Sequence, residues 1–234
     1  MVLMVAVLIQ RMDLSSMADG LDTPLYSLQA PGLDGKRPLS TSLREAATVS
    51  LEHIRSVQPT GPYHLLGWSL RRVLAHEIAV QLQAVGETVG ALIILDQYPK
   101  DPGIRTVIGD EPAPDEEAQL AALTEVVRKE AGAVLGNAPD EELRRFAVLR
   151  RNNFTCINAH EYGRFDGDAL LVVADRSIPE RAPTAELWKP YITGEISEVR
   201  LPCGHEDLNT PAMLGQMWAV AAPWLGRSGD APSS

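Results

Sequence analysis

Cysteine is scarce in this chain: only two of its 234 residues are cysteines, Cys156 and Cys203. Two cysteines provide neither a disulfide framework nor a cluster of metal ligands. We therefore expect a protein of the reducing cytoplasm whose site contains no metal. Both cysteines are interpreted as small apolar packing residues.

Clustered positive charge is also missing. The chain carries 21 Lys and Arg against 31 Asp and Glu, which gives a formal net charge of −10. Its nearest approach to a basic cluster, Arg144-Arg145 with Arg150-Arg151, is diluted by neighbouring acids. Because proteins bind phosphate backbones through grouped Lys and Arg, the composition predicts no nucleic-acid partner.

Long hydrophobic runs are absent as well. The longest apolar run, Met1 to Ile9, is far shorter than the ~20 residues of a membrane-spanning helix. It lacks the basic segment and the small-residue cleavage site of a signal peptide, so it is interpreted as a buried strand. We expect no membrane partner, although a chain with 45% hydrophobic residues can bury a full core.

What the sequence does contain is an alternation of short apolar runs with helical patterns. This pattern predicts an α/β fold with a mostly parallel central sheet flanked by helices. The expected strands are Val2–Ile9, Pro24–Gln29, His64–Trp68, Gly90–Leu95, Ala169–Ala174 and Ser197–Leu201. The expected core helices are Leu43–Val57, a helix from Leu70 that Gly86 ends, and Ala212–Leu225.

The pattern changes after the fourth expected strand. Four prolines between 99 and 114 break the chain, and two helical stretches follow, near Asp115–Ala133 and Asp140–Ala159. We interpret residues of about 98–163 as a helical insertion that forms a lid over an α/β active site. Residues 1–227 are then one domain, and 228–234 are expected to be a flexible tail.

Three residues with the chemistry of a serine hydrolase follow expected strands. Ser69 stands at a strand–turn–helix junction, where the N–H of Leu70 would point toward a developing oxyanion. His205 lies in the loop before the last helix and is a candidate base. Two acids occupy a suitable position between them, Asp96 and Asp175. The other four histidines are interpreted as packing or surface residues.

At these residues the sequence resembles the type I thioesterase domains that end nonribosomal peptide synthetases, which have the α/β-hydrolase fold. The similar segments run from Pro24 to Leu225, and the densest are 24–32, 58–69, 75–79, 95–96, 162–167 and 188–194. The resemblance implies a triad of Ser69, Asp96 and His205, and it favours Asp96 over Asp175 as the acid.

The resemblance also implies a reaction and a partner. The substrate would be a peptidyl thioester on the phosphopantetheine arm of a carrier protein, released by hydrolysis or macrocyclisation through an acyl-O-serine. No cofactor is expected, because the pantetheine arm arrives with the substrate, and the excised domain is expected to be monomeric. The alternatives are a free-standing editing thioesterase or esterase, and a catalytically impaired module that binds the carrier protein.

Two departures from the family pattern affect one functional element. Arg71 and Arg72 replace the two glycines of the family's elbow. The loop expected after the first strand lacks the family's glycines and reads Val-Ala-Val-Leu-Ile over residues 5–9, so that Val7 or a neighbour would supply the second oxyanion donor. We therefore predict a distorted elbow or oxyanion hole and slow turnover.

Overall fold

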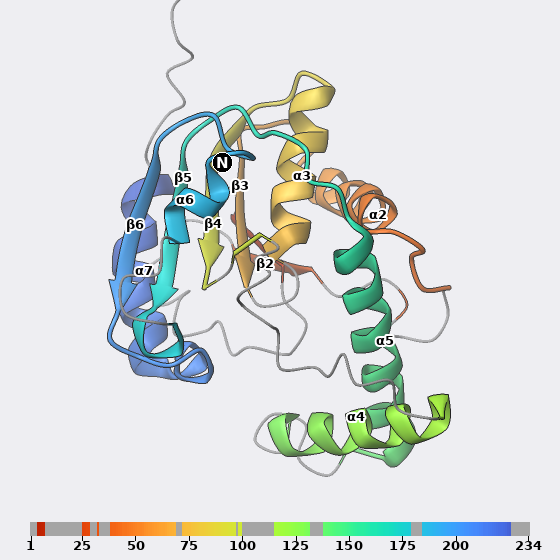
Figure 1. Cartoon of the computed structure of the whole chain (residues 1–234). Coiled ribbons are helices and arrows are strands. Elements are labelled where there is room, and N and C mark those ends of the chain that lie inside the picture. The colour runs from red at the N-terminus through yellow and green to blue at the C-terminus, as the bar shows by residue number, and fades with distance from the viewer. Residues whose placement is uncertain are drawn as a thin grey trace, which may run out of the picture.

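Among the residues that the structure describes, six strands, all parallel, form the centre of the fold in a computed structural model (Figure 1). The model describes residues 4–7, 25–28, 32, 38–68, 72–96, 98–99, 115–131, 138–178 and 184–225. The strand order is β2-β1-β3-β4-β5-β6. The strands are β1 (Met4–Val7), β2 (Leu25–Leu28), β3 (Tyr63–Trp68), β4 (Val89–Leu95), β5 (Ala169–Ala174) and β6 (Ile196–Leu201).

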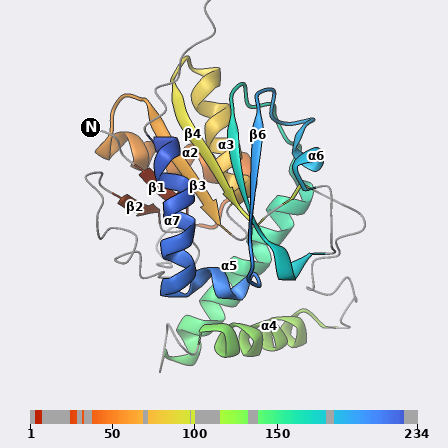
Figure 2. The ribbon, with the colours of Figure 1, turned by 90° about the vertical axis from the view of Figure 1, so that its left-hand side faces the viewer.

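Helices cover both faces of the sheet. One face carries α2 (Leu43–Val57) and α3 (Arg72–Ala84), and the opposite face carries α7 (Pro211–Leu225) (Figures 1 and 2). Each face has its own hydrophobic cluster, because the fully buried strands point alternate side chains to opposite sides. This three-layer arrangement leaves the carboxyl ends of the parallel strands at a single edge.

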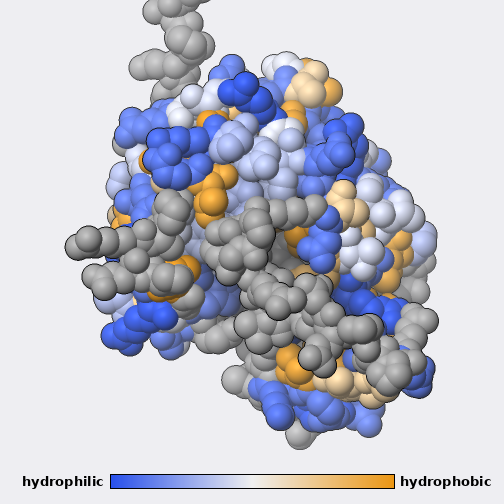
Figure 3. Space-filling model, in the orientation of Figure 1, coloured by the Kyte–Doolittle hydropathy of each residue, from blue (hydrophilic) through white to orange (hydrophobic). Residues whose placement is uncertain are grey.

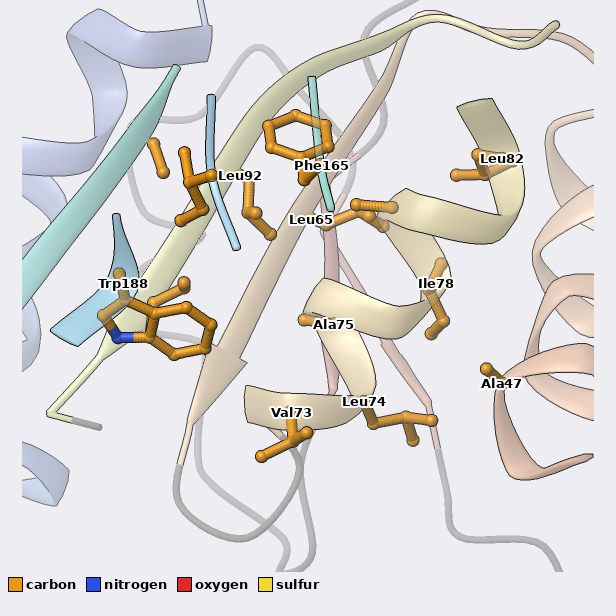
Figure 4. Packing of buried hydrophobic residues seen from close by; sticks show 14 of the residues in the cluster. Ala47, Leu65, Val73, Leu74, Ala75, Ile78, Leu82, Leu92, Phe165 and Trp188 are labelled. Carbon is orange, nitrogen blue, oxygen red and sulfur yellow. The ribbon is translucent and has the colours of Figure 1, made fainter. Parts of the chain in front are cut away.

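The helix α3, which follows β3, is held in place by its buried side chains. Its Val73, Leu74, Ala75, Ile78 and Leu82 are buried and pack against the sheet and α2 (Figure 4). Burial of a large aliphatic side chain contributes roughly 1.5–3 kcal/mol. The helix is therefore held firmly against the sheet, and three residues separate its start from the end of β3.

Ser42 and Glu45, at the start of α2, have the spacing of a helix cap. The Ser42 hydroxyl accepts a hydrogen bond from the Glu45 N–H at 3.1 Å, as a helix N-cap does. The Glu45 carboxylate bonds to the N–H and hydroxyl of Thr41, each at 2.7 Å, and so reaches one residue further back than in a capping box.

Two helices, α4 (Glu116–Ala131) and α5 (Asp140–Ala159), follow β4 in the chain (Figure 1). They share a small hydrophobic cluster, separate from the two clusters of the sheet, that contains Leu120, Val127, Leu143 and Ala147. The last turns of α5 contact the body of the fold: Asn152 Nδ2 donates to the Ser40 carbonyl at 2.9 Å, and Ile157 belongs to the main cluster.

The short elements were not foreseen. The five-residue helix α6 (Thr184–Trp188) and the 3₁₀ turns η2 (Asp175–Ser177) and η3 (Glu206–Asn209) follow β5 and β6. The expected tail at 228–234 lies outside the described residues.

The described surface is mostly hydrophilic on the face of Figure 3, with apolar residues in small separate groups. Within the described ranges no helix has the length and apolar character needed to cross a membrane.

Candidate active site

The predicted site residues lie at the carboxyl edge of the sheet. Asp96 directly follows β4, and His205 follows β6 in the loop that leads to η3. Although 109 residues separate them in the chain, His205 Nδ1 lies 2.7 Å from Asp96 Oδ2. The Asp96 side chain is 4% exposed and that of His205 is 30% exposed. The carboxylate is thus enclosed, while the imidazole reaches the surface of the site.

The second oxygen of Asp96 is also bonded. Its Oδ1 accepts the Ala174 N–H at 2.9 Å and the Tyr98 hydroxyl at 3.2 Å. The backbone of Asp96 has a φ of +46°, a left-handed conformation that aspartate adopts more readily than most residues. Its N–H donates to the Val172 carbonyl at 2.6 Å, which fixes this turn on the neighbouring strand.

Tyr98 is a donor to this carboxylate and not an acid in its own right. Burial, aided by the negative charge of Asp96, raises the pKa of the Tyr98 phenol well above its ordinary value. The phenol therefore stays protonated and keeps its hydrogen for Asp96.

Two contacts orient the His205 loop. The Asp207 carboxylate accepts the Gly204 N–H at 2.8 Å, and Leu208 of the following turn is buried. On the other side, the Trp68 indole stacks on the His205 imidazole with ring centroids 5.8 Å apart. Because Trp68 is the last residue of β3, the histidine ring lies beside the strand that leads to Ser69.

For the remaining predicted residues, the structure describes mainly the neighbouring parts of the chain. Ser69, Leu70 and Arg71 lie outside the described residues, and for Arg72 the backbone alone is described. Val7 ends β1, where it pairs in register with Gly67 of β3. The backbone of Val7 is therefore next to the strand that ends at Trp68.

The rival acid has a different partner. Asp175 Oδ1 accepts a hydrogen bond from Arg200 Nη1 at 3.0 Å, and the Asp175 side chain is half exposed. Arg200 also bonds Glu198 at 2.7 Å, so Asp175 belongs to a charged network on β6. His205 pairs with Asp96 in this structure.

The Cys203 thiol and the rings of His64 and His76 are buried. Cys203 lies two residues before His205, but burial, together with the charges of Asp207 and Asp96, raises the pKa of its thiol. Burial lowers the pKa of His64 and of His76, which keeps both rings neutral. Among the described residues, no group of three or more His, Cys, Asp or Glu side chains could hold a metal ion.

The sequence indicates the acid and the base, but its patterns do not indicate the contacts that Tyr98 and Trp68 make with them. A tyrosine two residues after a strand-end acid is the one signal that could have suggested the first contact.

Comparison with known proteins identifies the family. The family model of the thioesterase domain matches residues 14–219. The chain belongs to this family. The predicted class, a serine hydrolase that acts on thioesters, is therefore confirmed, as is the resemblance to synthetase domains.

One relative of this thioesterase domain is a dimodular nonribosomal peptide synthase of Bacillus subtilis (strain 168), 32% identical over 226 residues. The match covers 87% of this chain and 9% of the synthase, so the chain spans a small part of that relative's length. Another relative, enterobactin synthase component F of Escherichia coli (strain K12), is 28% identical over 210 residues, which are 87% of this chain and 16% of the relative.

The fold of the thioesterase domain is shared with a solved structure. This is the covalent complex of the NocB thioesterase domain with a fluorophosphonate nocardicin G analogue, which has a TM-score of 0.72 and 22% identity. The match covers 96% of this chain and 94% of that one. The predicted α/β-hydrolase fold is thereby confirmed.

Proposed function

We propose that this thioesterase domain releases a peptidyl chain from the phosphopantetheine arm of a carrier protein, by hydrolysis or macrocyclisation. The observation that carries the proposal is the 2.7 Å bond between Asp96 and His205 at the edge where β3 leads directly to Ser69. The chemistry of the substrate is inferred from relatives that are nonribosomal peptide synthetases.

The proposed reaction begins with Ser69. Its Oγ attacks the thioester carbonyl carbon while His205 Nε2 takes the hydroxyl proton, and Asp96 stabilises the resulting imidazolium. The backbone N–H groups of Leu70 and Val7 are the proposed donors to the oxyanion. When the C–S bond breaks, the departing pantetheine sulfur receives the proton from His205, and the peptide remains as an ester on Ser69.

A second nucleophile then releases the peptide. Water, or a hydroxyl or amine of the peptide itself, gives its proton to His205 and attacks the ester carbonyl, and the proton returns to Ser69 Oγ. We propose that residues of about 98–163, which include α4 and α5, act as a lid within a single domain and decide which nucleophile enters. The reaction requires no further cofactor.

The test is turnover of a peptidyl N-acetylcysteamine thioester, a mimic of the pantetheine arm, by the parent and by Ser69→Ala. We expect release of the thiol by the parent and its loss in Ser69→Ala, with a peptidyl adduct on Ser69 detected by mass spectrometry in the parent. An inactive parent that still binds a phosphopantetheinyl carrier protein would instead favour the impaired module. Equal turnover by the two proteins would refute the role of Ser69.

The acyl chain length of the preferred substrate distinguishes peptide release from the other alternative, an editing thioesterase. If short acyl thioesters are released faster than peptidyl thioesters, the chain is an editing thioesterase and the proposed peptide release is wrong.

A further inference from the structure

Tyr98 contacts the candidate triad from the point where the chain leaves the sheet. It follows Asp96 by two residues, it is buried, and its hydroxyl lies 3.2 Å from Asp96 Oδ1. This distance is at the long end for an O–H···O hydrogen bond, and bonds of this kind often shorten when the substrate binds.

The two oxygens of Asp96 have separate tasks. Oδ2 faces His205 Nδ1 at 2.7 Å, whereas Oδ1 accepts both the Ala174 N–H and the Tyr98 hydroxyl. A carboxylate bonded at both oxygens cannot rotate about its Cβ–Cγ bond without losing contacts. The donors on Oδ1 therefore set the direction in which Oδ2 meets the imidazole.

The Tyr98 bond also affects the charge that His205 meets. A donor on Oδ1 withdraws negative charge from the carboxylate, so less of that charge faces the imidazole. Without the donor, an imidazolium at His205 would be stabilised more strongly, but the Ala174 N–H alone would hold Oδ1, so the carboxylate would keep the reactive geometry less firmly.

We propose that Tyr98 is a positioning residue of this thioesterase, which acts on His205 through Asp96 by holding the carboxylate and moderating its charge. The inference rests on the proposed function, since it gives Asp96 and His205 their catalytic roles. In this proposal Tyr98 acts only through Asp96, to which its hydroxyl donates.

The test compares Tyr98→Phe with the parent in steady-state turnover of the peptidyl thioester across pH 5 to 9. We expect kcat to fall about tenfold, as for loss of a hydrogen bond to a charged group. The acid limb of the kcat/KM profile should move to higher pH, because the ring of His205 becomes more basic. KM should change little.

A matched control is Tyr63→Phe. The Tyr63 hydroxyl is also buried and donates to the Gln58 carbonyl at 3.3 Å, at the opposite end of β3 from the site. Its loss should lower stability and leave the pH profile unchanged. The other charged groups around the pair, Asp207, Glu198 and Arg200, are the same in both variants and in the parent.

A second variant keeps the test sound if Tyr98→Phe fails to fold. Site-specific replacement of Tyr98 by 3-fluorotyrosine retains the packing and makes the phenol a stronger donor. The acid limb should then move to lower pH, opposite in sign to the effect of phenylalanine.

The outcomes separate the two hypotheses. An active parent whose kcat and pH profile are unchanged by Tyr98→Phe refutes the positioning role and leaves the proposed function intact. If Tyr98→Phe does not fold, a 3-fluorotyrosine variant with the parent's profile refutes it equally. A parent without thioesterase turnover refutes the proposed function first.

Discussion

Replacement of Asp96 by asparagine should lower turnover strongly, because it changes which ring nitrogen of His205 carries the proton. In the parent, Oδ1 of Asp96 accepts two hydrogen bonds, from Ala174 and Tyr98, and only an oxygen can do so. The new NH₂ group must therefore take the place of Oδ2, opposite His205 Nδ1. Because an NH₂ only donates, the imidazole would turn its acceptor toward it and carry its proton on Nε2, where it cannot accept the serine proton.

The size of the effect follows from this change of tautomer. An asparagine in place of a triad aspartate lowers kcat by about 10⁴, which corresponds to about 5 kcal/mol in the activation free energy. Almost none of this loss should appear in folding stability, because the asparagine has the shape of the aspartate and keeps its contacts to Ala174 and Tyr98.

Asp175→Asn is the matched control. It removes the ion pair with Arg200, in which the Arg200 side chain is 30% exposed and that of Asp175 is 50% exposed. Ion pairs this exposed contribute about 0.2–1 kcal/mol to stability. Its turnover should equal that of the parent within a factor of about two.

The assay is release of N-acetylcysteamine from a peptidyl thioester, followed by a thiol reagent, with stability measured by urea denaturation. If Asp96→Asn retains a tenth or more of the parent's kcat while Asp175→Asn loses a thousandfold, the assignment of the acid is wrong.

Three further predictions test stability and the elbow. Burial lowers the pKa of His64 and His76 below the ordinary 6.5, so below that pH the unfolded chain binds more protons than the folded one. The free energy of unfolding should therefore fall as the pH drops from 7.5 to 5.5, by up to about 1.4 kcal/mol per pH unit for each ring. In urea denaturation, His64→Gln should show a shallower decline with pH than the parent, and an equal slope would contradict this. Gly194→Ala should lower stability by about 1–3 kcal/mol, since a Cβ there would meet the Gly167 carbonyl and the Asp168 carboxylate. Gly215→Ala, in open space on α7, should instead raise stability by roughly 0.5–1 kcal/mol, and thermal melts measure both effects. If the elbow is distorted, a fluorophosphonate should label Ser69 more slowly than it labels ordinary serine esterases. Labelling should be faster in the variant carrying Arg71→Gly and Arg72→Gly, and an unchanged rate in that variant would show that the arginines do not cause the distortion.

The sequence predicted the sheet well because the strands are short, apolar and separated by clear helical patterns. The strand Ala169–Ala174 was placed with the correct bounds, and β3 and β6 each begin only one residue earlier than expected. The helix α6 was missed since five residues give no periodicity. The burial of α6 depends on Trp188, which packs in the main cluster against residues that are distant from it in the chain.

The pairing of Asp96 with His205 could be anticipated for a simple topological reason. Parallel strands end at one edge, so the residues that follow β4 and β6 are brought to the same side of the sheet. The spacing of Tyr98 from Asp96 suggests a contact but does not fix it, because the contact depends on the left-handed turn at Asp96. The catalytic roles of Ser69, Leu70 and Val7 stay predictions.

The separate packing of the two ends of α5 makes this helix a lever. Its last turns are fixed near Ser40 and in the main hydrophobic cluster, while among the described residues its first turns share a separate cluster with α4. From Asn152 back to Asp140 the helix covers about 12 residues, or about 18 Å, so a rotation of about 10° about the fixed turns would carry the α4 end through about 3 Å. We expect that a displacement of this size, about the diameter of a water molecule, could occur with both clusters intact.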